Sequence, residues 1–302
     1  MTARLPRGAN ASAFPVATVV VPTRDRPGPL AACLAALEAQ TVRSFEIVVV
    51  DDRSRDPSTV AAVVAGVSGA RLVHGDGRGP AAARNVGAAA ARGPVVCFTD
   101  DDCRPGSRWL QTVLDRVRAG AHIVAGPTRN GRPWDRWATA SQTVTNHLTE
   151  ATYEPGTGQV GFAPTSNLAV VADVQRRLPF DETYPLAAGE DREWCSRATA
   201  EGMAIAFEPA AWVEHHQNLS LRTFWRQQVR YGRGAHRWRR GRDGPRRLQP
   251  ARFYVELVRA GLSQGAGVGL LVALSQVATA VGVAQEAIAV RRCADRRGGS
   301  RR

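Results

Sequence analysis

The chain has 302 residues, of which 44% are hydrophobic and 22% charged, so it is globular and long enough for one large or two small domains. Five cysteines without regular spacing or a C-x-x-C pair exclude a disulfide framework and a zinc site, and they favour a reducing compartment. Residues 1–14 lack the apolar core of a signal peptide, so we expect no secretion and a flexible N-terminal arm.

The formal net charge of +13 is concentrated near the C-terminus. Residues 1–221 contain 22 arginines and 23 acidic residues, whereas residues 222–302 contain 18 arginines and 4 acidic residues. Such asymmetry predicts an anionic partner for the tail, such as phospholipid headgroups, a phosphorylated substrate or nucleic acid. A basic tail that is merely solvated is the alternative. The tail contains no recognisable nucleic-acid motif, so we do not expect nucleic acid.

The first 125 residues alternate between predicted strands and predicted helices. Apolar runs predict buried strands, and the Leu or Ala periodicity between them predicts helices. Continuous Val and Ile runs that alternate with helices indicate an α/β fold with a mostly parallel sheet covered on both faces. The predicted strands are ATVVVPT at 17–23, EIVVVDD at 46–52, RLVH at 71–74 and PVVCFTD at 94–100.

Beyond residue 125 the alternation fades. The sequence predicts a strand with a preceding turn within 158–171, a loop entering a helix within 188–202, and an amphipathic helix over 221–240. Residues 260–285 carry no formal charge and could span a bilayer, but their Ser and Gln residues make a poor span. We therefore favour helices that pack on the domain or lie on a membrane over a spanning segment.

Three aspartates in a row follow the fourth predicted strand. If the extended chain persists, Asp100 and Asp102 point to one side and Asp101 to the other. Two carboxylates on one side form a hard oxygen site for Mg²⁺ or Mn²⁺, with positions left for substrate phosphates. The alternative is a solvated turn that caps the next helix.

Other polar residues also follow predicted strands or begin helices. In open α/β sheets ligands bind at the carboxyl ends of the strands, so Asp52 could accept a nucleobase N–H or a ribose hydroxyl. Arg84 and Asn85 offer a guanidinium and an amide to a base or a phosphate. Each of these residues could instead be structural, Asp52 as a cap or turn residue.

Two further groups lie late in the chain. In Glu190-Asp191, a carboxylate could act as general base for a hydroxyl nucleophile, or it could only complement a helix dipole. The pair His215-His216 could supply a metal ligand, although histidines at such positions are more often structural. Spacing alone does not decide between these alternatives.

Taken together and in order, these segments resemble the large family of inverting nucleotide-sugar glycosyltransferases with a GT-A fold, often called family two. The resemblance runs over residues 16–240. It rests on the first strand-helix-strand unit, which ends in VVVDDRSRD, and on three later motifs, which are GPAAARNVGAAAARGPVVCFTDDDCRPGSRWL, SNLAVV and GEDREWCSRA. A single D-x-D is a weak signal, whereas this ordered set is specific.

The resemblance implies a role for each matching residue. Asp191 would be the general base that deprotonates the acceptor hydroxyl, and Glu190 would help to place the acceptor. Asp102 and Asp100 would hold the metal, with Asp102 the more direct ligand and His215 a further one. The implied nucleotide pocket contains Thr23, Arg26, Asp52, Arg84, Asn85 and Asp100, with Asp52 at the nucleobase. Asn167 and Trp194 would lie near the sugars.

The chain departs from the family pattern in three places. It has DDR at 51–53 where DDGS is usual, which affects the loop beside the nucleotide, and LPFDE at 178–182 where GGFDE is common, which affects the acceptor wall. QQVRY at 227–231 is similar to the Q-x-x-R-W of processive synthases but has Tyr in place of Trp, and its Arg230 would contact the diphosphate. The several transmembrane helices of those synthases are missing, and we expect single-sugar transfer.

The predicted function is therefore metal-dependent transfer of a sugar, with inversion, from a nucleoside-diphosphate sugar to a hydroxyl acceptor. We expect Mn²⁺ or Mg²⁺, a UDP-sugar donor, an acceptor that can be lipid-linked, and a peripheral site at the inner face of the cell membrane. The predicted domains are a nucleotide half at 15–125, an acceptor half at 126–220 and a basic helical region at 221–302. A nucleotidyltransferase and a non-catalytic nucleotide-sugar-binding relative are the alternatives.

Overall fold

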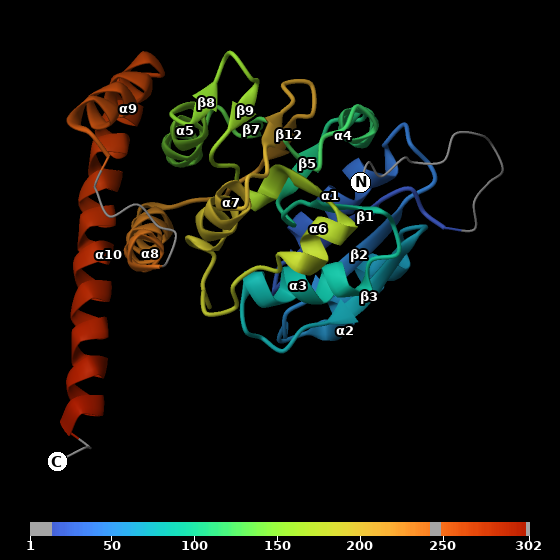
Figure 1. Cartoon of the computed structure of the whole chain (residues 1–302), viewed down its shortest axis with the longest axis horizontal. Coiled ribbons are helices and arrows are strands. Elements are labelled where there is room, and N and C mark those ends of the chain that lie inside the picture. The colour runs from blue at the N-terminus through green and yellow to red at the C-terminus, as the bar shows by residue number, and fades with distance from the viewer. Residues whose placement is uncertain (1–13, 242–248, 300–302) are drawn as a thin grey trace.

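The computed structural model describes residues 14–241 and 249–299 (Figure 1), and it describes side chains as far as residue 291. The predicted N-terminal arm lies outside this part of the chain except for Phe14. Within it, nine strands form one sheet in the order β3-β2-β1-β4-β10-β6-β11-β9-β8. These strands are β1 (Thr18–Thr23), β2 (Glu46–Asp51), β3 (Ala70–His74), β4 (Val95–Phe98), β6 (Ile123–Ala125), β8 (Tyr153–Glu154), β9 (Gln159–Val160), β10 (Leu168–Val171) and β11 (Ile205–Phe207).

The first half of the sheet is parallel and the second half is mixed. Strands β3, β2, β1 and β4 are parallel neighbours, whereas β10 lies antiparallel between β4 and β6. The carboxyl ends of the parallel strands β3, β2, β1 and β4 therefore meet at one edge, where ligands of open α/β sheets bind. The four strands predicted from the apolar runs are all present, each within two residues of its predicted bounds.

Helices cover both faces of this sheet because its buried side chains alternate. Val19 and Val21 on β1 pack with one cluster of helices, and Val20 packs with the other. The first face carries α1 (Pro27–Glu38), α2 (Pro57–Ala65) and α4 (Trp109–Arg118), and the second carries α3 (Pro80–Ala90), α6 (Ala172–Arg177) and α7 (Glu190–Ala200). The α/β fold class predicted from the sequence is confirmed.

Proline fixes where the first three helices begin. Pro27, Pro57 and Pro80 each occupy the first turn, where the missing N–H costs nothing and the fixed φ suits a helix. Gly79 precedes α3 with φ of 97°, and a Cβ at that position would lie 2.3 Å from the carbonyl oxygen of Pro185. A glycine is therefore required where α3 meets the loop around Pro185, called the 185 loop below.

A second, smaller sheet carries the end of the aspartate run. Its strands are β5 (Cys103–Pro105), β12 (Val213–His215) and β7 (Thr128–Asn130), in the order β5-β12-β7. In the antiparallel β5–β12 pair, His215 lies opposite Cys103. Residues more than 100 positions apart in sequence thus become neighbours beside the main sheet. The 3₁₀ helix η1 (Thr165–Asn167) precedes β10.

Helices α5 (Arg136–Glu150), α8 (Leu221–Arg240), α9 (Ala251–Ser263) and α10 (Ala266–Gly299) form a layer beside α7, with α10 outermost (Figure 1). The uncharged stretch 260–285 is not one helix, because Gly265, with φ of 124°, separates α9 from α10. Residues Ala266–Arg291 of α10 are long and apolar enough to cross a membrane, and 39% of the most apolar window is buried. In this structure α10 packs along α8.

Close approach between α8 and α10 depends on glycine. A Cβ at Gly282 would lie 1.9 Å from the carbonyl oxygen of Val229, and one at Gly232 would lie 2.0 Å from that of Thr279. The buried Glu286 of α10 also accepts hydrogen bonds from Arg233 (2.8 Å) and Arg237 (2.6 Å) of α8. Backbone contact and paired charge together hold α10 against the body of the protein.

Candidate active site

The carboxyl ends of β1 and β4 bring one basic and two acidic side chains into direct contact. Arg26 donates from Nη1 to Asp101 (2.8 Å) and from Nη2 to Asp102 (2.6 Å). Thr23 Oγ1 donates to Asp101 Oδ2 (2.7 Å). The predicted alternation, with Asp101 opposite Asp102, is wrong because β4 ends at Phe98 and residues 101–102 form a turn that aims both carboxylates at Arg26.

The two carboxylates differ in protonation although they share one guanidinium. Burial raises the pKa of Asp101 to about 7, which Arg26 only partly offsets. Burial also acts to raise the pKa of Asp102, but His215 and Arg26 outweigh it and hold that pKa below the usual range. Asp102 is therefore ionised at neutral pH and is the stronger candidate for binding a cation.

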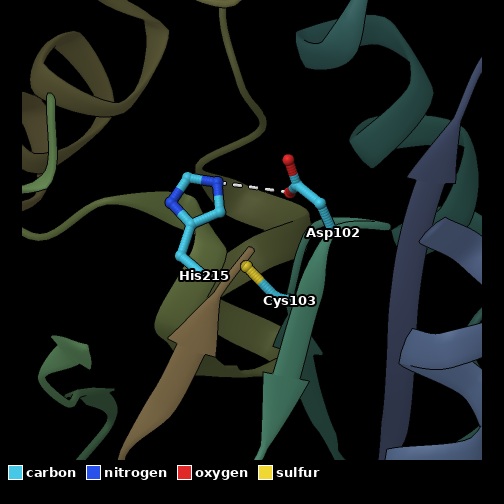
Figure 2. Close-up of side chains that lie close together, drawn as sticks. All are labelled: Asp102, Cys103 and His215. Carbon is cyan, nitrogen blue, oxygen red and sulfur yellow. Dashed lines mark ion pairs between the residues drawn. The ribbon is translucent and has the colours of Figure 1, made fainter. Parts of the chain in front are cut away.

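His215 faces Asp102 across the small sheet (Figure 2). Its Nε2 lies 3.2 Å from Asp102 Oδ1, and Gln142 Oε1 lies 3.1 Å from its Nδ1, which fixes the ring orientation. Burial acts to lower the pKa of His215, and Asp102 outweighs it so that the net shift is upward. This ring can therefore donate to Asp102 or, when neutral, offer a nitrogen to a metal.

Asp102, Cys103 and His215 place one ligand atom each within 4.8 Å of one another (Figure 2). The buried Cys103 thiol has a pKa raised well above its usual value by burial, so it is neutral. The remaining carboxylate and imidazole fit a divalent cation that keeps further positions for phosphate oxygens. Asp100 is outside this group and faces Arg84 instead.

Arg84 joins two acidic sites that are far apart in sequence. Its Nη2 lies 2.8 Å from Asp100 Oδ1 and its Nη1 lies 3.1 Å from Glu190 Oε1. The residue is 3% exposed, and burial of an arginine requires such pairing. The sequence predicted a ligand contact for Arg84. In the structure its guanidinium is paired with the aspartate run and with α7, and the residue also lines the cleft.

Asp52 orders the loop in front of α3 and also lines the cleft. Its carboxylate accepts hydrogen bonds from the backbone N–H groups of Gly77 (2.8 Å) and Gly79 (3.0 Å). Arg53 adopts φ of 63°, in the left-handed region, at the position where the usual DDGS pattern has glycine. The departure from that pattern therefore keeps the backbone turn and adds a side chain beside Gly77.

The GED triplet begins α7 against α8. Gly189 has φ of 91°, and a Cβ there would lie 2.8 Å from the carbonyl oxygen of Gly234 on α8. Asp191 Oδ1 accepts the backbone N–H of Arg192 (2.8 Å). Burial raises the pKa values of both Glu190 and Asp191, and repulsion between the two carboxylates adds to the shift of Glu190. Both groups are thus more basic than ordinary carboxylates.

The cleft above these residues has a volume of about 830 Å³, a size that accommodates a nucleotide. It is lined by residues from β1, the aspartate run, the 185 loop and α8, including Thr23, Arg26, Asp52, Arg84, Asp100, Asp102, His215 and Arg230. Besides Arg230, the QQVRY motif contributes two further lining residues, Gln227 and Tyr231. Tyr231 follows Arg230 on the same wall.

A second cavity of about 180 Å³ adjoins the cleft between α7, α8 and α9. Asp191 lines this second cavity and not the cleft. The two spaces share the lining residues Arg84, Asp100, Ala187, His215, Gln217 and Tyr231. The cavity and the cleft therefore adjoin at these residues.

Three residues that the sequence assigned to ligands line neither space. The Asn85 amide is fully hydrogen-bonded to the 180–182 segment: its nitrogen donates to the Phe180 carbonyl and the Glu182 carboxylate, and its oxygen accepts from the Phe180 N–H. Asn167 accepts from the indole of Trp109 and donates to two carbonyl groups, and it is 2% exposed. Trp194 is fully buried and donates to the carbonyl of Leu178. All three have structural roles, because their polar atoms already have protein partners.

Sequence reasoning missed Gln217, Gln228, Arg192 and Arg239, all of which line the second cavity. Arg192 directly follows the GED triplet in the sequence, so its position next to that motif could have marked it as a candidate site residue. Arg239 lies on α8, and no motif marked it among many arginines. Only the packing of α8 against α7 brings it to the cavity.

A mixed sheet whose parallel half ends in an acidic edge beside a nucleotide-sized cleft is the arrangement of the GT-A class of glycosyltransferases. The chain belongs to glycosyl transferase family 2, whose family model matches residues 18–175.

Its relatives include the pre-mycofactocin glycosyltransferase of Mycobacterium tuberculosis (strain ATCC 25618 / H37Rv), at 28% identity over 225 residues. That match covers 72% of this chain, which spans only 46% of the relative's length. The glycosyltransferase AglE of Haloferax volcanii is 26% identical, with 74% of each chain covered.

Solved structures agree on the fold. The mannosyltransferase PcManGT of Pyrobaculum calidifontis, in complex with GDP-Man and Mn²⁺, superposes with a TM-score of 0.57 at 18% identity, covering 98% of this chain and 83% of that one. TarS of S. aureus in complex with UDP gives a TM-score of 0.51 at 17% identity, covering 81% and 70%. The predicted GT-A fold and family are confirmed.

Proposed function

We propose that this protein transfers a sugar from a nucleoside-diphosphate sugar to an acceptor hydroxyl, with inversion at the anomeric carbon. The observation that carries the proposal is the junction of two spaces at Arg84 and Asp100, with the acidic cluster in the larger space and Asp191 in the smaller. The larger space suits the donor nucleotide and the smaller one the acceptor. This geometry lets a hydroxyl approach the donor sugar from the side of Asp191.

In this proposal Asp191 is the general base. Its pKa is raised, mainly by burial, so it accepts a proton more readily than an exposed aspartate does. Glu190 Oε2 has no hydrogen-bond partner within the part of the chain that the structure describes, so it is free to orient a second hydroxyl of the acceptor. Arg84 holds Glu190 in place through the other oxygen.

Asp102 and His215, with Asp100 nearby, would hold a divalent cation. When bound, such a cation neutralises charge on the diphosphate leaving group. Support comes from the ionised Asp102 facing His215, and from PcManGT, whose complex contains Mn²⁺ and GDP-Man. Arg230 lines the same cleft and carries an unpaired Nε among the described residues, which suits a diphosphate contact. Asp52, Thr23 and Arg26 would line the nucleotide, and a UDP-sugar remains the expected donor.

The decisive experiment is a thermal-stability titration with nucleoside diphosphates and nucleotide sugars, with and without Mn²⁺. Ligand at 100 times its Kd stabilises the native state by about 2.7 kcal/mol. We expect a Mn²⁺-dependent shift with one nucleotide that is lost in Asp102→Ala and retained in Asp173→Ala, an exposed aspartate of α6. Absence of a shift with every nucleotide would contradict the proposal.

A turnover assay separates transfer from the alternatives. Incubation with the donor and an acceptor should release a nucleoside diphosphate. NMR of the glycosylated product should show an anomeric configuration opposite to that of the donor sugar. Release of pyrophosphate would instead indicate a nucleotidyltransferase, and nucleotide binding without turnover a non-catalytic relative.

We also propose that the basic helical region 221–302 attaches the protein peripherally to an anionic membrane surface. Support comes from the surplus of arginine and from apolar side chains on the outer side of α10, where Leu270 is 71% exposed and Val277 56% exposed. Vesicle co-sedimentation tests this. Binding to vesicles with phosphatidylserine should exceed binding to phosphatidylcholine alone, weaken with salt, and fall in Leu270→Glu. Equal recovery in the supernatant with both vesicles would refute it.

A further inference from the structure

The second cavity combines apolar side chains with two positive charges that make no ion pair with any described residue. Arg192 at the start of α7 and Arg239 near the end of α8 both line it. Within the described part of the chain, neither guanidinium makes an ion pair or a side-chain hydrogen bond, and the buried Nε of Arg239 is without a partner. Partly buried charges normally have partners, so this pair requires an explanation.

The charges around this cavity do not balance. Arg84 is already matched to Asp100 and Glu190. Apart from these three residues and His215, the charged side chains that line the cavity are one carboxylate, that of Asp191, and two guanidinium groups, those of Arg192 and Arg239. When Asp191 is protonated, no carboxylate among these side chains neutralises the guanidinium groups of Arg192 and Arg239. Burial lowers the pKa of Arg192, and the like charge of Arg239 adds to this while Asp191 opposes it.

Arg192 is held in a fixed orientation. Its guanidinium lies over the rings of Phe162 (5.4 Å to the centroid) and Trp238 (5.3 Å). Stacking uses the faces of the planar group and leaves the N–H donors at its edge available. These donors form a fork that matches a carboxylate or a phosphate.

Gln228 supplies an independent indication of a polar ligand. It is completely buried, lines the cavity, and has no partner for either the oxygen or the nitrogen of its amide among the described residues. Buried amides without partners are rare in native proteins and indicate a missing partner. Apolar side chains also line the cavity, among them Val144, Leu148, Phe253 and Leu257.

We propose that the acceptor carries an oxyanion, a carboxylate or a phosphate, attached to a compact apolar part, and that Arg192 and Arg239 bind this oxyanion beside Asp191. The identity of the ligand as an acceptor rests on the proposed function, whereas the anion site can be tested without nucleotide. The source of the oxyanion is either a small aromatic molecule or a prenyl phosphate.

The test is calorimetric titration of the full-length protein, without nucleotide, with matched probes. Phenylacetate and phenyl phosphate are compared with phenylacetamide and benzyl alcohol, and geranyl phosphate with geraniol. We expect each anion to bind about tenfold or more tightly than its neutral counterpart, because hydrogen bonds to charged groups exceed neutral ones. The tighter of phenyl phosphate and geranyl phosphate identifies the source. Equal binding of the anionic and neutral probes would overturn the proposal.

Variants locate the site. Arg192→Gln and Arg239→Gln should weaken the anionic probes about tenfold and leave the neutral probes unchanged, whereas Arg222→Gln, an exposed arginine of α8, should have no effect. Equal weakening in Arg222→Gln would indicate diffuse surface charge and contradict the site. Arg226 lines the cleft and not the cavity, so stronger weakening in Arg226→Gln would place the probe in the cleft and also contradict the proposal. The wild-type comparison stands even if a variant fails to fold.

A failure of the proposed function gives a different pattern. If no nucleotide binds but phenylacetate binds in an Arg192-dependent manner, the anion site stands and the transferase proposal falls. If nucleotide binds and the anionic probes do not, the reverse holds.

Discussion

The guanidinium of Arg84 lies 3.1 Å from the carboxylate of Glu190, although 106 positions separate the two residues in the sequence. The other side of the guanidinium contacts Asp100, so one buried arginine connects the aspartate run to Glu190, the residue next to the proposed base Asp191. Loss of this contact would affect both the fold and the site, which makes it the first target for mutation.

We predict that Arg84→Gln lowers the free energy of unfolding by about 3 kcal/mol, because it leaves Glu190 buried without its cation. Denaturant unfolding measures this. Arg78→Gln is the matched control, since Arg78 pairs with Glu182 but is 56% exposed, and it should cost less than about 1 kcal/mol. Similar losses of unfolding free energy in both variants would show that the buried Arg84–Glu190 pair contributes no more to stability than an exposed ion pair.

The pH dependence of kcat/KM should report on Asp191. The base must be deprotonated, and burial raises its pKa, so activity should fall with decreasing pH at values above the ordinary aspartate pKa of about 4. Asp191→Asn should remove this limb and lower kcat by about 10²–10⁴-fold. Asp173→Asn, an exposed aspartate outside both spaces, should keep the wild-type profile. Wild-type turnover in Asp191→Asn would exclude the base assignment.

His215 and its neighbour His216 form a natural test of the metal site. His215→Ala should weaken Mn²⁺ binding about 10–100-fold, because the imidazole facing Asp102 is lost. His216 pairs with Glu214 and lines neither space, so His216→Ala should leave Mn²⁺ affinity unchanged. Titration of Mn²⁺ followed by electron paramagnetic resonance measures both. Unchanged affinity in His215→Ala would remove this residue from the site.

The crossing of α8 and α10 predicts an asymmetric effect of adding one methyl group. Gly282→Ala should cost about 1–3 kcal/mol, because the Cβ would collide with the backbone of Val229. In Gly267→Ala, on the same helix, the added Cβ would have no neighbour within 4 Å, so the change should be neutral or stabilise by up to about 1 kcal/mol. Thermal unfolding distinguishes them, and equal melting temperatures would argue against close packing of α10.

Much of the fold follows from local patterns. The Val runs, the proline at each helix start and the helical Ala and Leu spacing locate β1, β2, β4 and α1–α3, because strand and helix periods depend on neighbouring residues. The aspartates that follow a buried strand predicted a ligand site at that edge of the sheet, whereas the proposed base in the GED triplet came from the family resemblance. These signals need no knowledge of what packs against them.

The remaining features depend on contacts between distant segments. The turn after Phe98 aims Asp101 and Asp102 at Arg26, and the small sheet places His215 opposite Cys103. Asn167 and Trp194 matched ligand-binding positions by sequence, yet their partners come from other elements and fix them in the interior. The sequence by itself determined the strands and helices of the first 100 residues, the family and the acidic edge. Tertiary structure decided which of these polar groups remain free to bind a ligand, because hydrogen-bond partners and burial are set by residues far away in the chain.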